Sequence, residues 1–115
     1  MNKLLFVCFV FLFCFSCKQE EVVIPDNIIP YDKMVQILTD VQQSEVAILF
    51  LRNSKASDLP KPESLYKSIL DKHEISVEEF EISFAFYSAN TELMEKMYGD
   101  IIEELTKRQV QLESN

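Results

Sequence analysis

The sequence contains a single glycine, Gly99, and this scarcity limits the folds that the chain can adopt. Short β-hairpins usually need a turn that contains glycine, and the sequence has no such turn signal. No segment alternates apolar and polar residues over the length of a strand either. Apolar residues instead recur every three or four positions, which is the spacing of one face of an α-helix. The sequence therefore predicts an all-α fold, a small bundle of about four helices.

Prolines and polar residues divide this pattern into four helical segments, which we expect over residues 31–51, 63–72, 77–87 and 92–112. The start of the third segment is the best defined, because Ser76 and Glu79 have the spacing of a capping box. Gly99 lies inside the last segment, where it weakens the helix by about 1 kcal/mol relative to alanine. A glycine at this position would also let a neighbouring helix approach closely.

The N-terminus has the pattern of a lipoprotein signal peptide. Lys3 is followed by an apolar run over residues 4–15, which is shorter than the roughly 20 residues needed to span a bilayer. Ser16 then places a small residue immediately before Cys17. We predict that residues 1–16 are a cleavable lipoprotein signal peptide and that Cys17 carries the lipid, including palmitate. An uncleaved N-terminal anchor and an ordinary secretory signal remain as alternatives.

Cleavage after Ser16 would divide the chain into three parts. These are the signal peptide over 1–16, a lipidated N-terminus and tether over 17–29, and a helical domain of unknown function over 30–112. Cys8 and Cys14 would leave with the signal peptide, so Cys17 would have no cysteine partner for a disulfide within the chain.

The chain is acidic, with a net charge of −8, and residues 1–16 contribute only Lys3 to its basic groups. No basic patch offsets this charge, so we expect no nucleic-acid partner. For the same reason we expect the membrane to be bound through the lipid on Cys17 rather than through charge. A protein partner in the cell envelope is also expected.

The residues after Cys17 bear on the compartment. The second position of the predicted mature chain is Lys18 rather than the aspartate that commonly retains lipoproteins at the inner membrane, so we expect a lipid-anchored protein of the outer membrane. The run from Lys18 to Glu21 also resembles the surface-export signal of Bacteroidetes lipoproteins. A solvated polar tether is the other interpretation of this run, and display at the cell surface stays open.

Two residues are candidates for a structural or functional pair. Glu45 interrupts the apolar stripe of the first helical segment, where it either lies at the edge of the core or is half-buried and needs a partner. His73 is the only histidine and follows the second segment, where it could donate to Glu45 or to a free carbonyl. A single histidine is weak evidence for a metal, and one glycine cannot build a phosphate loop. We therefore expect no catalytic, metal or cofactor-binding residues and no enzyme activity.

Several of these segments together resemble a family of small Bacteroidetes lipoproteins that carry a helical domain of unknown function. The resemblance covers residues 27–108 and is carried by residues 34–41, 44–47 and 65–73, and by Phe80, Ser83, Phe84 and Tyr87. Members usually have glycine after the histidine, where this chain has Glu74. The resemblance implies an anchored helical domain and no assigned activity.

The leading functional hypothesis is therefore a membrane-anchored helical module with a binding or accessory role. Met94, Met97 and the many aromatic residues could present an apolar groove to a partner, or they could form the core. The alternative hypothesis is a chaperone-like holdase for envelope proteins.

Overall fold

The computed structural model describes residues 1–13 and 21–115, with only the backbone described for residues 10–13. Cys14 and Cys17 thus lie outside the described residues. Within the described part the chain is all-helical and has no strand. Its five helices are α1 (Asn2–Phe13), α2 (Tyr31–Asn53), α3 (Pro62–Lys72), α4 (Val77–Ala89) and α5 (Thr91–Ser114).

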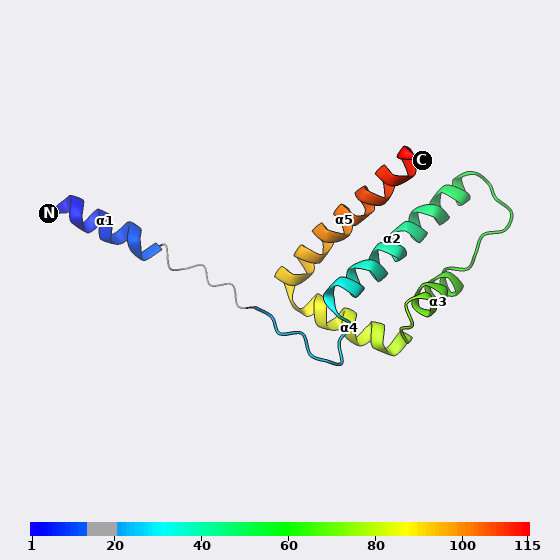
Figure 1. Cartoon of the computed structure of the whole chain (residues 1–115), viewed down its shortest axis with the longest axis horizontal. Helices are drawn as coiled ribbons and strands as arrows, with labels where there is room; N and C mark the ends of the chain where they lie inside the picture. Colours follow the sequence, from blue (N-terminus) through cyan, green and yellow to red (C-terminus); the bar gives the residue numbers. More distant parts are fainter. Residues whose placement is uncertain (14–20) are drawn as a thin grey trace.

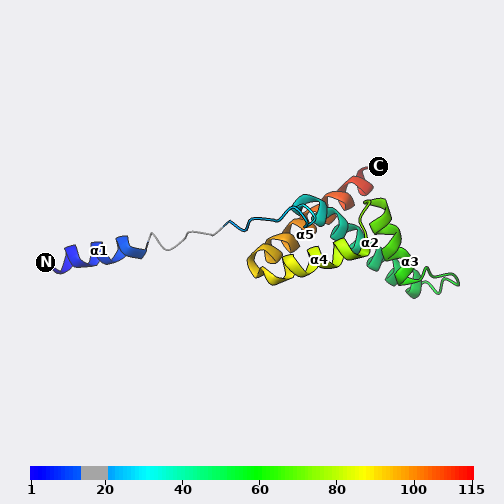
Figure 2. The same ribbon diagram turned by 90° about the horizontal axis from the view of Figure 1, so that it is seen from below.

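Helices α2 to α5 form the bundle that the sequence predicts, and α1 lies apart from them (Figure 1). The long helices α2 and α5 pack side by side. Their contacts show that they run in the same direction: Tyr31 at the start of α2 contacts Asp100, and Asp40, further along α2, contacts Arg108, further along α5. Helix α3 packs on the other side of α2, and α4 runs from the C-terminal end of α3 to the N-terminal end of α5 (Figure 2). Among the described helices, none has an apolar stretch as long as a bilayer crossing requires.

The core lies where the four helices meet. It is mainly aliphatic and sulfur-containing, with aromatic rings contributed by α4. The fully buried side chains are Met34, Ile37 and Thr39 of α2, Leu70 of α3, Ser83 and Tyr87 of α4, and Met97 of α5. Met94 is also buried, so both methionines of the expected apolar groove belong to the core.

The segment before α2 is part of this core, which corrects the expected end of the tether at Ile29. Ile28 and Ile29 are both buried. The backbone N–H of Ile29 donates to Ser83 Oγ at 2.9 Å, and the Tyr87 hydroxyl donates to the Ile29 carbonyl at 2.6 Å. The physical reason is that burying the two adjacent isoleucine side chains is more favourable in free energy than leaving them exposed in a solvated tether. We call residues 28 and 29 the N-terminal strap.

The predicted capping box at the start of α4 is confirmed. Ser76 Oγ accepts from the Glu79 backbone N–H at 3.1 Å, and Glu79 Oε2 accepts from the Ser76 backbone N–H at 3.0 Å. Two of the free N–H groups at this helix end are therefore satisfied.

Helix α3 ends in a Schellman motif whose left-handed residue is Glu74, with φ of 57°. The N–H of Ile75 donates to the Leu70 carbonyl at 2.9 Å, and the N–H of Glu74 donates to the Asp71 carbonyl at 3.1 Å. Glycine is the usual residue at this position because it has no Cβ to clash. The family's usual glycine would suit this turn, and Glu74 adopts the same conformation at a steric cost.

Gly99 has a different role from the one expected. A Cβ built on it would meet no atom within 4 Å, so this glycine does not enable close helix packing. It lies on an exposed part of α5.

Replacing Glu74 with glycine should raise the free energy of unfolding by about 1 kcal/mol, because glycine adopts the left-handed conformation without strain. Urea denaturation of the full chain measures this difference. The matched control is Glu74→Ala, which removes the same carboxylate but keeps a Cβ. Equal stability of the glycine and alanine variants would contradict the prediction.

Candidate functional site: an aspartate-centred ion cluster between three helices

Asp40 of α2 is the most enclosed carboxylate in the described domain, with 8% of its surface exposed. Arg108 of α5 donates from Nη1 to Asp40 Oδ1 at 2.7 Å. Two residues at the end of α3 contact the other oxygen, with His73 Nε2 at 2.7 Å and Lys72 Nζ at 3.1 Å from Oδ2. Since an ionised carboxylate only accepts, the proton in the histidine bond is on Nε2. One side chain therefore joins α2, α3 and α5.

Arg108 is held by two further groups. Its Nη1 also donates to Gln43 Oε1 at 2.7 Å, and its Nε donates to Glu104 Oε1 at 3.2 Å. These bonds fix the guanidinium plane between α2 and α5, so that several donors are satisfied at once. We call Asp40, His73, Lys72, Arg108, Gln43 and Glu104 the Asp40 cluster.

The charges of the cluster stabilise one another. Burial alone would raise the pKa of Asp40, but the hydrogen bonds from Arg108, His73 and Lys72 outweigh burial and hold that pKa at about 2. The hydrogen bond to Asp40 raises the pKa of Arg108 above its ordinary value against the effect of burial. Asp40 is thus ionised at neutral pH and suits a structural ion pair better than proton transfer.

The structure separates the candidate pair Glu45 and His73. Within the described residues His73 pairs with Asp40, and no hydrogen bond or ion pair joins it to Glu45. Glu45 is exposed on α2, so it is not a half-buried carboxylate that needs a partner. The physical reason is helix geometry: five residues rotate the chain by about 140°, so Asp40 and Glu45 lie on different faces.

Sequence reasoning missed Asp40 and Arg108 as partners of the histidine. Asp40 lies outside the apolar stripe of α2, and in the sequence it is marked only by its place in the family resemblance over residues 34–41. Asp40 and Arg108 are 68 positions apart in the chain. Their contact depends on how α2 and α5 are aligned, which periodicity within each helix does not determine.

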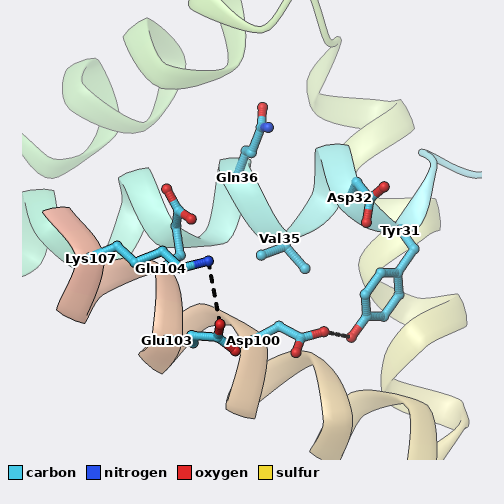
Figure 3. A pocket seen from close by; sticks show the side chains of 8 residues that line it. All are labelled: Tyr31, Asp32, Val35, Gln36, Asp100, Glu103, Glu104 and Lys107. Atoms are coloured by element: carbon cyan, nitrogen blue, oxygen red, sulfur yellow. Dashed lines mark hydrogen bonds and ion pairs between the residues drawn. The ribbon is translucent and has the colours of Figure 1, made fainter.

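A second group of polar residues lies around a hollow of about 360 Å³ between α2 and α5. Figure 3 shows the Tyr31 hydroxyl pointing to Asp100 and Val35 lying between the two helices. The hydroxyl donates to Asp100 Oδ2 at 2.6 Å, and Lys96 Nζ lies 4.6 Å from the centre of the Tyr31 ring. Burial, and then the bond to Asp100, raises the pKa of Tyr31.

The carboxylates of this hollow belong mostly to local pairs. Lys107 Nζ lies 3.3 Å from Glu103, and Glu104 binds Arg108 of the Asp40 cluster. In the part of the chain that the structure describes, no group of three or more histidine, cysteine, aspartate or glutamate residues could hold a metal ion. The predicted lipidation residue, Cys17, is not among the described residues.

The comparison with family models covers the same region as the bundle. Residues 25–111 match the model described as "Domain of unknown function (DUF4296)". The chain belongs to this DUF4296 family. The membership confirms the resemblance to a family with a helical domain of unknown function. Neither a curated protein nor a solved structure matches the chain.

The span matched by the DUF4296 model coincides with the structural unit. It begins at Pro25, before the N-terminal strap, and ends at Gln111, beyond Arg108. The strap, the capping box and the whole Asp40 cluster therefore lie inside the DUF4296 domain.

Replacing Asp40 with asparagine should lower the free energy of unfolding at pH 7 by about 3 kcal/mol, because it leaves Arg108 without its enclosed counter-charge and weakens the bond to His73. Lowering the pH should reduce the difference in stability between the wild type and Asp40→Asn. Since the folded pKa is about 2 and the ordinary value is 3.8, the wild type loses about 2 kcal/mol as the pH falls from about 4 to below 2. Urea titrations at a series of pH values measure both effects.

Asp71→Asn is the matched control, because Asp71 is an exposed aspartate on α3. Its stability at pH 7 should stay within about 0.5 kcal/mol of the wild type. A loss as large as that of Asp40→Asn would show that the effect does not come from the enclosed cluster.

Proposed function

We propose that the protein is a membrane-anchored envelope lipoprotein whose DUF4296 domain is a helical binding or accessory module. The binding role is supported by an apolar stripe on α5 that the other helices of the bundle do not cover. Tyr98 and Ile102 are 52% and 64% exposed, and Leu105 continues the stripe as a half-buried residue. They have the 4 and 3 residue spacing of one helix face.

Such a stripe suits a helix-to-helix or helix-to-groove contact with another protein. Single exposed apolar residues are normal on a protein surface, but neighbours on one helix face form a continuous patch. The expected methionine groove does not contribute, since Met94 and Met97 are buried.

The separation of α1 from the bundle supports the anchoring part of the proposal. None of the described residues of α1 belongs to the hydrophobic core, so removal of residues 1–16 would leave the domain's packing intact. A lipid on Cys17 would then replace the apolar segment as the membrane contact. Two or more acyl chains are needed for stable anchoring. The outer membrane, with surface display as a further option, is the proposed location.

We propose a non-enzymatic role for the domain. The enclosed carboxylate, Asp40, already accepts hydrogen bonds from Lys72, His73 and Arg108. It is therefore a poor proton donor or acceptor near neutral pH.

Substitution of Cys17 by serine should abolish palmitate labelling and cleavage at residue 16, because a hydroxyl cannot form the thioether to the lipid. Metabolic labelling and the mass of the protein in the membrane fraction measure both outcomes. Cys8→Ser is the matched control and should retain labelling and cleavage. A Cys17→Ser protein that is still labelled and cleaved would contradict the anchoring proposal.

Paired substitution of Tyr98 and Ile102 by serine should weaken capture of an envelope partner by about tenfold or more, as expected for apolar contact residues. Cross-linking in intact cells followed by mass spectrometry measures the capture. Val110→Ser is the matched control, because Val110 is 58% exposed on a different face of α5. Thermal unfolding of all variants checks that the fold is retained.

If the paired variant retains the same neighbours as the wild type, the stripe is not a binding surface. If the wild type is cross-linked to many unrelated envelope proteins instead, the holdase hypothesis replaces the specific module.

A further inference from the structure

The C-terminal part of α2 extends beyond the residues that bind α5. The last hydrogen bond between the two helices joins Gln43 to Arg108. Beyond it, Val46, Leu49 and Phe50 are each more than half exposed. Figure 1 shows this end of α2 as the part of the helix furthest from α4. An apolar helix face therefore continues past the core.

Two opposite charges border this face. Glu45 and Arg52 are seven residues apart, so they lie within about 20° of each other on the helix surface. Ile48 and Leu49 lie between them, and with Pro62 of α3 these four residues line a shallow groove of about 310 Å³. Neither charged side chain has a hydrogen-bond or ion-pair partner in the described part of the chain.

The order of charges along this groove is self-complementary. When two copies of a helix pack antiparallel about a two-fold axis, each residue on one flank meets a residue of the same flank in the other copy. With the axis between Ile48 and Leu49, Glu45 of one copy faces Arg52 of the other, and the same pair forms again on the other side of the axis. A parallel two-fold arrangement would instead put this flank of the two copies on opposite sides of the interface, so Glu45 and Arg52 would not meet.

We propose that the end of α2 is a homodimer interface in which two copies pair antiparallel, with Glu45 opposite Arg52 of the second copy. The apolar contact is supplied by Val46, Leu49 and Phe50. The chain's net charge of −8 repels a second copy elsewhere, so two oppositely charged pairs at the axis make this end the favourable place of contact. The inference does not depend on the lipid anchor or on the α5 stripe.

A lipid surface is the main competing occupant of the same residues. Arg52 and Lys55 would suit an anionic bilayer, but Glu45 borders the same groove and would be repelled by it. The charge pattern therefore favours a second copy.

Charge exchange tests the proposal on the full chain in a non-ionic detergent by sedimentation equilibrium. Glu45→Arg and Arg52→Glu should each weaken dimerisation by about tenfold or more, since like charges then face each other at both pairs. An equimolar mixture of these two variants should form mixed dimers, because each charge again meets its opposite. The double variant E45R/R52E should dimerise as the wild type does.

Rescue in the mixture shows that the single variants are folded and that the two positions meet across the interface. Glu95→Arg is the matched control, since Glu95 is an exposed glutamate on α5, and it should leave the dimer unchanged. Leu49→Ser should weaken the dimer without rescue by any charge exchange.

A monomeric wild type would overturn the proposal, as would single variants that dimerise as well as the wild type. If the wild type is monomeric and binds phosphatidylglycerol vesicles in a way that Leu49→Ser and Phe50→Ser abolish, the face belongs to a lipid surface, and the proposal is wrong.

Discussion

The enclosure of the Asp40 carboxylate is the constraint on which the arrangement of the helices depends. A charge in this position is tolerated only where cations and hydrogen-bond donors surround it. The donors come from the C-terminal end of α3 and from α5, so these two helices can take few positions relative to α2 without losing a bond to Asp40. The apolar core beside the cluster supplies most of the driving force for folding, whereas the cluster selects one alignment of α2 with α5. Helix α4 is then held by its connections and by the aromatic side chains that it places in the core.

Much of the bundle could be predicted from local patterns. The apolar spacing located all four helices of the domain to within a few residues, and the spacing of Ser76 and Glu79 defined one helix start because a capping box involves only neighbouring residues. The partner of His73 could not be predicted in the same way. Asp40 and Glu45 are both acidic residues on α2, and only the rotation and offset of α3 against α2 decides which of them reaches the imidazole. The strap was missed for a related reason, since Pro25 and Asn27 indicate irregular backbone whether or not the isoleucines that follow are buried.

The two unpartnered apolar faces differ in what borders them. The stripe on α5 continues the side of the helix that packs in the core, and the charged pairs along α5 are satisfied within the domain. The face at the end of α2 has Glu45 and Arg52 on one flank. A surface of the first kind accommodates partners of varied sequence, whereas paired charges discriminate among partners and set their orientation. We thus propose one surface for another protein and one for a second copy of the domain, and the two are on different helices.

The N-terminal strap also has a mechanical consequence. Any pull on the residues before Pro25 is transmitted through Ile29, whose backbone is held by Ser83 and Tyr87 of α4. The load therefore acts on two hydrogen bonds and the burial of two isoleucines before it reaches the first turn of α2. Because both bonds join the strap to the C-terminal half of α4, tension is directed into the core and not along the axis of α2. The strap would bear this load before it reaches α2, so that α2 and the Asp40 cluster stay aligned while the N-terminal segment is under tension.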